Sequence, residues 1–174
     1  MDKKARPKGT ARRPARGRKP PRQPGKIVLL VDDDADWRLL VRDVLAQSEI
    51  ASQFQLQVHE AADGEAALHY LFRQDGRSEL PLPDLIYLDC EMPRLDGVTM
   101  LNIIRHDPRL RNIPIVMLTG VADEAEMRRA TECGASAYIV KPPDLAELAR
   151  VLHASADYWL RSRAGDAGTI GQAA

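Results

Sequence analysis

Residues 26–34 of this chain read KIVLLVDDD, a continuous apolar run that ends in three aspartates. A short apolar run without alternation is typical of a parallel β-strand that is buried on both faces. Three similar runs follow at residues 85–88, 115–118 and 137–140. Residues 54–58 instead alternate between apolar and polar side chains, which favours a half-exposed edge strand. The sequence therefore predicts five short strands.

Helical patterns separate these strands. The first predicted helix has one apolar face, made by Trp37, Leu40, Val41, Val44 and Leu45. We expect further helices at residues 66–72, 98–106 and 123–133, and a long last helix from residue 145. Gly134 is placed to end the helix at residues 123–133 as its C′ residue. Five strands alternating with five helices predict an α/β fold, for which a flavodoxin-like doubly wound parallel sheet is the first candidate.

The charge is distributed unevenly along a chain whose formal net charge is zero. Residues 1–25 hold ten Lys and Arg against one acid, Asp2, and five prolines, but no aromatic residue and no Ile, Val or Leu. Such a segment buries too little apolar surface to offset its ordering entropy, so we expect a disordered tail. Three interpretations of residues 1–25 remain open. The segment makes a weak contact with nucleic acid or an anionic surface, it is a solubilising tail, or its start codon is assigned too far upstream.

Composition also excludes several classes of protein. The two cysteines, Cys90 and Cys133, do not make a disulfide framework, which favours a reducing, cytoplasmic location. No apolar run approaches the roughly 18 residues of a membrane span. The basic N-terminus is not followed by the apolar segment of a secretory signal. We expect a globular domain at residues 26–160 and a flexible tail at residues 161–174.

Polar side chains follow four of the predicted strands at the same edge of the sheet. The first strand runs into Asp32 and Asp33, and the third, fourth and fifth strands lead to Asp89, Thr119 and Lys141. Three converging carboxylates repel one another unless a cation binds, and oxygen ligands without His or Cys favour Mg²⁺. A carboxylate beside a divalent ion, a lysine and a hydroxyl can accept a phosphoryl group as an acyl phosphate.

Four motifs resemble those of the response-regulator receiver domain, the CheY-like family, over about residues 26–155. The resemblance implies a five-stranded sheet of order 2-1-3-4-5 with five helices. The motifs are VDD at residues 31–33, DCEMPRLDG at residues 89–97, LTG at residues 118–120 and YIVKP at residues 138–142.

The resemblance also implies a role for each matching residue. Asp89 matches the phospho-acceptor, Asp32 and Asp33 match the acidic pair that holds magnesium, and the backbone carbonyl of Glu91 matches a further metal ligand. The triple aspartate leaves a second pairing open, Asp33 with Asp34; in the first pairing, Asp34 falls where an N-cap for the first helix is wanted.

The remaining roles concern the phosphoryl group and the switch. Thr119 and Lys141 match residues that hold phosphoryl oxygens, and Tyr138 matches an aromatic switch, although a plain core aromatic is the alternative. The bond between Lys141 and Pro142 matches a cis peptide of the family. Cys90 favours a packed small hydrophobe over a redox sensor.

A narrower resemblance is to single-domain regulators that partner bacteriophytochrome-like histidine kinases. It is carried by the long loop before the third strand (residues 73–83), by residues 107–114 and by Tyr158-Trp159-Leu160. In that group the last helix can support dimers. A homodimer through helix 4 (residues 123–133), strand 5 (residues 137–140) and helix 5 (from residue 145) is therefore one expectation. The implied function is a stand-alone receiver, not an enzyme with a separate substrate, that a sensor histidine kinase phosphorylates and that signals to an unidentified protein.

Three other functions remain open on the residues alone. A transcription regulator would use the basic tail on DNA. An aspartyl-phosphate hydrolase of another fold would want a second acid two residues after the nucleophile, where Glu91 stands, but Met92-Pro93 and the Asp32–Asp33 pair argue against it. A degenerate receiver acting as a scaffold is disfavoured by the complete set of site residues.

Overall fold

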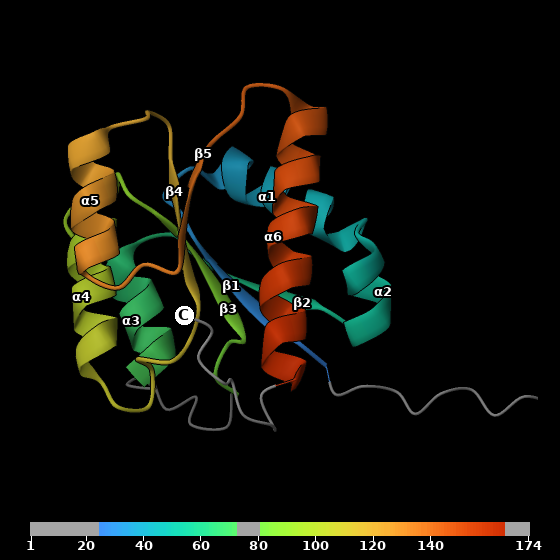
Figure 1. Ribbon diagram of the computed structural model, residues 1–174, viewed down its shortest axis with the longest axis horizontal. Helices are drawn as coiled ribbons and strands as arrows, with labels where there is room; N and C mark the ends of the chain where they lie inside the picture. The colour runs from blue at the N-terminus through green and yellow to red at the C-terminus, as the bar shows by residue number, and fades with distance from the viewer. Residues whose placement is uncertain (1–24, 73–80, 166–174) are drawn as a thin grey trace, which may run out of the picture.

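The computed structural model describes residues 25–72 and 81–165. Its five strands form one parallel sheet of order β2-β1-β3-β4-β5 (Figure 1). This order confirms the predicted doubly wound topology. The strands are β1 (Ile27–Val31), β2 (Gln57–Ala61), β3 (Leu85–Asp89), β4 (Ile115–Thr119) and β5 (Ala137–Val140).

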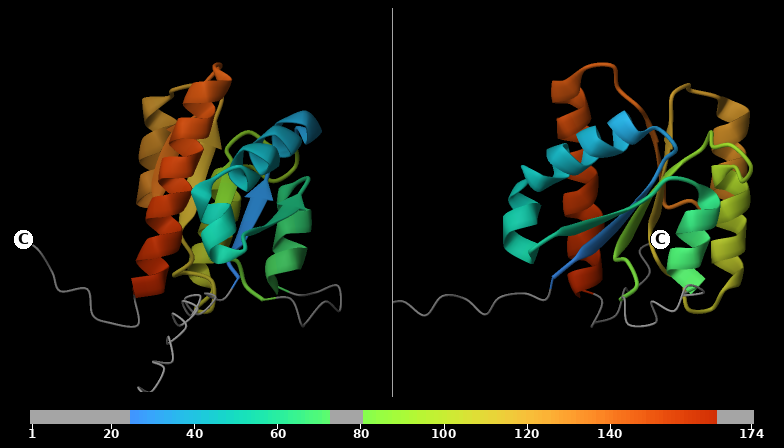
Figure 2. Two further views of the ribbon diagram at one scale, coloured as in Figure 1. Left: turned by 90° about the vertical axis from the view of Figure 1, so that its right-hand side faces the viewer. Right: turned by 180° about the vertical axis from the view of Figure 1, so that it is seen from behind.

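Helices cover both faces of the sheet. Figures 1 and 2 show α1, α2 and α6 on one face and α3, α4 and α5 on the other. The helices are α1 (Ala35–Ala46), α2 (Glu49–Phe54), α3 (Gly64–Phe72), α4 (Gly97–His106), α5 (Glu124–Glu132) and α6 (Leu145–Gly165). The helix α6 therefore extends beyond residue 160, where the globular domain was expected to end.

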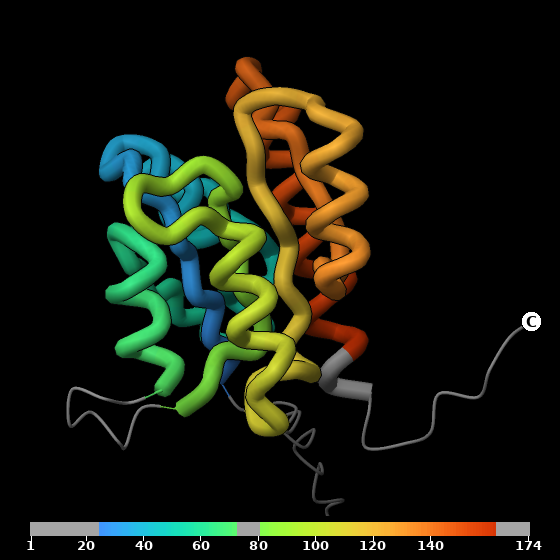
Figure 3. The backbone as a smooth tube through the Cα atoms, turned by 90° about the vertical axis from the view of Figure 1, so that its left-hand side faces the viewer, coloured from blue at the N-terminus to red at the C-terminus, as the bar shows by residue number. Residues whose placement is uncertain are grey.

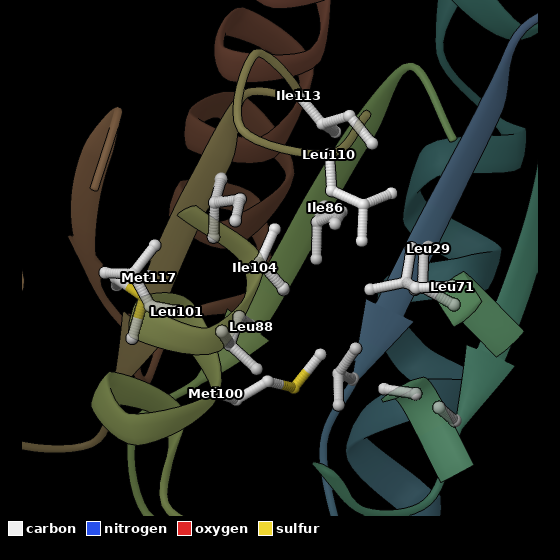
Figure 4. Close-up of a cluster of buried hydrophobic side chains, with 14 of the residues drawn as sticks. Leu29, Leu71, Ile86, Leu88, Met100, Leu101, Ile104, Leu110, Ile113 and Met117 are labelled. Carbon is white, nitrogen blue, oxygen red and sulfur yellow. The ribbon is translucent and has the colours of Figure 1, made fainter. Parts of the chain in front are cut away.

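Two separate clusters of apolar side chains hold these layers together. The strands β1, β3 and β4 are buried along their whole length, because their side chains alternate between the two faces and both faces are covered. Figure 3 shows the face covered by α3, α4 and α5. In Figure 4, Leu29, Leu88 and Met117 of the sheet pack on this face with Met100 and Ile104 of α4. The cluster on the opposite face consists mainly of Val28, Leu30, Val41, Leu45, Leu85, Tyr87, Val116, Leu118, Leu148, Leu152 and Ala156.

The prediction for residues 54–58 was wrong in part, and it accounts for the one helix beyond the five expected. Phe54 ends the short helix α2, which Ser48 caps by accepting a hydrogen bond from Ala51 N, at 3.1 Å. Gln55 then takes a left-handed conformation, with φ of 50°, and β2 starts at Gln57. Phe54 is buried, but it lies at the end of a helix and not in a strand. It belongs to the apolar cluster on the face covered by α1 and α6, whereas α3 packs on the other face of the sheet. Apolar spacing alone did not distinguish these environments.

Two helix boundaries confirm predictions made from single residues. The Asp34 side chain caps α1, accepting hydrogen bonds from Asp36 N and Trp37 N at 2.9 and 3.1 Å. Gly134 follows α5 with φ of 89°, a conformation that favours glycine. The Asp34 cap sets where α1 leaves the edge of the sheet that carries the polar side chains, and Gly134 sets where α5 ends before β5.

Several expectations lie outside the described residues. The basic tail was predicted at residues 1–25, of which only residue 25 is described, and most of the long loop before β3 and residues 166–174 are also outside. Within residues 25–72 and 81–165, none of the helices has the length and hydropathy needed to cross a membrane.

Candidate functional site

The predicted site residues lie at the carboxyl ends of four neighbouring strands, at the upper edge of the sheet in Figure 1. Asp32 directly follows β1, and Asp89 and Thr119 are the last residues of β3 and β4. Lys141 directly follows β5, and its backbone N–H donates to the Thr119 carbonyl at 2.7 Å. Parallel pairing in register brings these chain-distant residues to one edge, as predicted.

Lys141 binds two of the carboxylates at once. Its Nζ lies 2.7 Å from Asp32 Oδ2 and 2.7 Å from Asp89 Oδ1. The Asp32 side chain is fully buried and the Asp89 side chain is 5% exposed, so both charges are largely removed from water. Burial of a charge is costly unless the charge is paired, and here the ammonium pairs with both carboxylates.

Asp33 completes a group of three acids. One carboxylate oxygen from each of Asp32, Asp33 and Asp89 lies within 4.8 Å of the others. Asp34 is not in this group, because its side chain caps α1. The assignment of Asp32 and Asp33 as the magnesium-binding pair stays a prediction. Carboxylate oxygens of three acids, with Asp33 exposed at the rim, form a donor set that suits Mg²⁺, which usually keeps several waters and few protein ligands. The residues therefore fit a magnesium ion.

The local electrostatics follow from burial and crowding. Burial raises the pKa of Asp89 to about 6, and the neighbouring charges of Asp32 and Asp33 act in the same direction, while the bond to Lys141 acts in the opposite direction. Burial disfavours the charged form of Lys141, but its two carboxylate partners outweigh this effect and raise its pKa. The ammonium therefore stays charged, and a divalent cation would favour the charged carboxylate of Asp89.

Thr119 is fully buried, and its hydroxyl is held by the backbone after β4. Its Oγ1 donates to the Val121 carbonyl at 3.1 Å and accepts from Val121 N at 3.3 Å. The same residue at the same edge was predicted to hold a phosphoryl oxygen. In the geometry described, the hydroxyl instead stabilises the turn that leads from β4 towards α5.

Tyr138 on β5 contacts α5. Its hydroxyl donates to Glu126 Oε2 at 3.2 Å, and burial raises its pKa. Thr119 and Cys90 lie close enough to the Tyr138 hydroxyl to influence that pKa as well. Cys90 is buried in the core cluster, and burial raises its own pKa to about 12, which agrees with a packed thiol rather than a reactive thiolate.

Two further expectations concern the loops that border the site. Glu91 is exposed in the loop after β3, and the metal-binding role of its carbonyl stays a prediction. The expected cis bond between Lys141 and Pro142 was wrong: within the described residues every peptide bond is trans. The trans form is the lower-energy isomer even before proline, by about 0.5–1 kcal/mol.

Sequence reasoning missed three residues that contact the site. Arg38 Nη1 donates to the Asp32 carbonyl at 2.6 Å and so supports the acidic loop. The Trp37 ring lies beside the Lys141 ammonium, which is 4.9 Å from the ring centroid. Glu126 accepts the Tyr138 hydrogen bond described above. Arg38 and Trp37 were visible only as part of the first helix, and nothing in their spacing indicated that they face strands β1 and β5.

Replacing Asp32 with asparagine should weaken magnesium binding by about 10- to 100-fold, because even outer partners of a bound metal usually contribute that much. Asparagine keeps the shape of the side chain and removes its charge. Isothermal titration calorimetry with MgCl₂ would measure the change. The matched control is Asp36→Asn, an exposed acid in the same segment, which should bind magnesium like the unsubstituted protein. Equal affinities for both variants would contradict the assigned ligand set.

Comparison with known proteins gives one family. The family model of the response regulator receiver domain matches residues 28–153. Response regulator Rcp1 of Synechocystis sp. is 32% identical over 139 residues, which span 80% of this chain and 92% of that protein. A probable methanogenesis regulatory protein, FilR2 of Methanothrix harundinacea, is also 32% identical, over 77% of this chain and 83% of that protein.

Solved structures of similar regulators share the fold. The phosphorylated cyanobacterial phytochrome response regulator RcpA superposes with a TM-score of 0.73 at 28% identity, over 85% of this chain and 99% of that chain. The Mn²⁺-bound form of Rcp1 gives a TM-score of 0.70 at 30% identity, over 86% of this chain and 99% of that chain.

Proposed function

Because this chain belongs to the response regulator receiver domain family and so to two-component signalling, we propose that Asp89 is its phospho-acceptor. The observation that carries this assignment is the double ion pair of Lys141. Its Nζ lies 2.7 Å from both Asp32 and Asp89, with Asp33 beside them. Among the described residues this is the one group of three acids close enough to share a metal ion.

Phosphoryl transfer asks mainly for positioning and charge neutralisation. The phosphodonor would be a phosphohistidine of the sensor kinase. An Asp89 carboxylate oxygen attacks its phosphorus, the bond from phosphorus to the histidine nitrogen breaks, and that nitrogen keeps the electron pair. Lys141 then pairs with a phosphoryl oxygen in place of one carboxylate oxygen. Receiver domains bind Mg²⁺ at an acidic site, and here Asp32, Asp33, Asp89 and the Glu91 carbonyl would hold the ion, which supplies positive charge to the phosphoryl oxygens.

The switch would involve Thr119 and Tyr138. The Thr119 hydroxyl exchanges its contacts with Val121, at 3.1 and 3.3 Å, for a phosphoryl oxygen. This movement of Thr119 leaves space beside β4, and the Tyr138 ring moves into that space. Tyr138 then loses its hydrogen bond to Glu126, which is 3.2 Å long. These three hydrogen bonds are worth about 1 kcal/mol each, so a charged phosphoryl group can compete with them.

The partners follow from the relatives and from the surface. RcpA is a cyanobacterial phytochrome response regulator, and we propose a bacteriophytochrome-like sensor histidine kinase as the phosphodonor in the cytoplasm. The homodimer surface was predicted on helix 4, strand 5 and helix 5, and these elements are α5, β5 and α6. Exposed Val140, Leu145 and Tyr158 lie on them and suit a protein target or a homodimer. We propose no separate substrate, and a weak nucleic-acid contact through the basic tail remains a hypothesis.

The proposed function is tested with acetyl phosphate, a small phosphodonor. With Mg²⁺ the protein should gain the mass of one phosphoryl group in intact mass spectrometry. The same mixture with excess EDTA should show almost none, because the acceptor carboxylate then remains paired with Lys141 and surrounded by uncompensated acids. Equal labelling in both mixtures, or no labelling in either, would contradict a magnesium-dependent acyl phosphate.

A further inference from the structure

The Lys141 ammonium has a third neighbour besides its two carboxylates. The face of the Trp37 indole lies beside it, with Nζ 4.9 Å from the ring centroid. This is within the roughly 6 Å at which a cation and an aromatic face attract each other. The lysine side chain is 18% exposed, so solvent weakens this attraction only partly.

Local structure fixes the position of the ring. The Trp37 backbone N–H is bonded to the cap residue Asp34, which places Trp37 in the first turn of α1. The ring packs against the apolar cluster on that side of the sheet. The start of α1 therefore holds an aromatic face at the end of β5, although β3 and β4 separate β5 from β1, the strand that α1 follows.

The choice of tryptophan at this position is informative. Its Nε1 is buried and has no hydrogen-bond partner within the described part of the chain. An unpaired buried N–H is unfavourable, and phenylalanine would fill an apolar site without one. What the indole offers in exchange is the strongest cation-binding face among the aromatic side chains.

We propose that Trp37 is a positioning residue for Lys141. This proposal rests on the function proposed above. The two carboxylate partners change during the reaction, since Asp32 would bind the metal ion and Asp89 would carry the phosphoryl group. Trp37 is the partner that does not change. It holds the ammonium over the acceptor when the carboxylates are drawn to the cation, and so keeps the ammonium where the phosphoryl oxygens arrive.

A double-mutant cycle with acetyl phosphate and saturating Mg²⁺ separates this role from simple packing. Trp37→Leu should lower the phosphorylation rate constant by about 5- to 10-fold, the range expected for a partly desolvated cation–π contact. Trp37→Phe should recover most of the rate, because a phenyl face remains. In the Lys141→Met background, Trp37→Leu should change the residual rate by less than about twofold, because the ammonium with which Trp37 interacts is no longer present.

The matched control is Leu40→Ala, which removes a neighbouring side chain of the same cluster and helix without touching the lysine. It should lower the melting temperature and leave the rate unchanged. An equal effect of Trp37→Leu with and without Lys141, or no effect in either background, would overturn the proposal. Failure of the unsubstituted protein to gain phosphate would instead refute the proposed function.

Fluorescence provides a readout that does not depend on phosphorylation. The chain has two tryptophans, so in the Trp159→Phe protein the emission comes from Trp37 alone. Mg²⁺ should change that emission, because the ammonium loses part of its pairing with Asp32 and Asp89 as the cation enters and so acts more strongly on the ring beside it. In the Lys141→Met, Trp159→Phe protein, calorimetry should still detect magnesium but the emission change should disappear. An emission change that persists without Lys141 would contradict the contact as the cause.

Discussion

Replacing Asp89 with asparagine is expected to abolish phosphorylation by acetyl phosphate. Asparagine has nearly the same shape but an amide that cannot form an acyl phosphate. It also removes a charge that lies 2.7 Å from Lys141 Nζ. In intact mass spectrometry the variant should stay unmodified under conditions in which the unsubstituted chain gains one phosphoryl group. The expected loss is complete, because the nucleophile itself is removed.

Folding has to be checked separately for this variant. The carboxylate of Asp89 is crowded by Asp32 and Asp33, so removing its charge should preserve or increase the melting temperature. Asp43→Asn, an exposed acid of α1, is the matched control and should be phosphorylated normally. Phosphate incorporation that survives Asp89→Asn would show that another residue is the acceptor.

Replacing Gly97 with alanine should destabilise the protein by about 3 kcal/mol, the upper part of the usual range for overpacking. Gly97 is the first residue of α4, and a Cβ there would lie 2.1 Å from the carbonyl oxygen of Asp89 and 3.0 Å from Cys90 Cα. Both of these are backbone atoms, so no side chain can rotate away. The change corresponds to a melting temperature lower by roughly 6–12 °C for a chain of this size.

Gly120→Ala is the matched control for Gly97→Ala. A Cβ at Gly120 would have no atom within 4 Å, so its melting temperature should equal that of the unsubstituted chain. Because the clash at Gly97 involves the acceptor residue's own carbonyl, Gly97→Ala should also slow phosphorylation at temperatures where the protein is folded. Equal melting temperatures for the two alanine variants would contradict the close approach of α4 to β3.

The sheet and its polar edge could be predicted because both depend on the strands themselves. The runs that form β1, β3 and β4 are apolar throughout, as burial on two faces requires, and the residue after each run has its position fixed by strand pairing. Asp32, Asp89, Thr119 and Lys141 could thus be placed together from the order of the strands along the chain. The same kind of local signal identified Asp34 and Gly134 as helix boundaries.

The parts that escaped prediction depend on contacts between elements distant in sequence. Phe54 follows a spacing that suits a strand, but it is buried at the end of α2 by packing against α6 and its neighbours. Trp37 was recognised as an apolar residue of the first helix. Its position beside Lys141 depends on how α1 crosses the end of the sheet, which no local pattern encodes. The hydrogen bond between Tyr138 and Glu126 joins β5 to α5 in the same way.

Chemical mapping can locate the acyl phosphate that we propose at Asp89. Borohydride reduces an acyl phosphate of aspartate to homoserine, a change that peptide mass spectrometry can locate at a single residue. After treatment with acetyl phosphate and Mg²⁺, homoserine should appear at position 89 and not at Asp32 or Asp33, whose carboxylates share the same pocket. Homoserine at another position, or phosphate on a residue that resists reduction, would contradict the account.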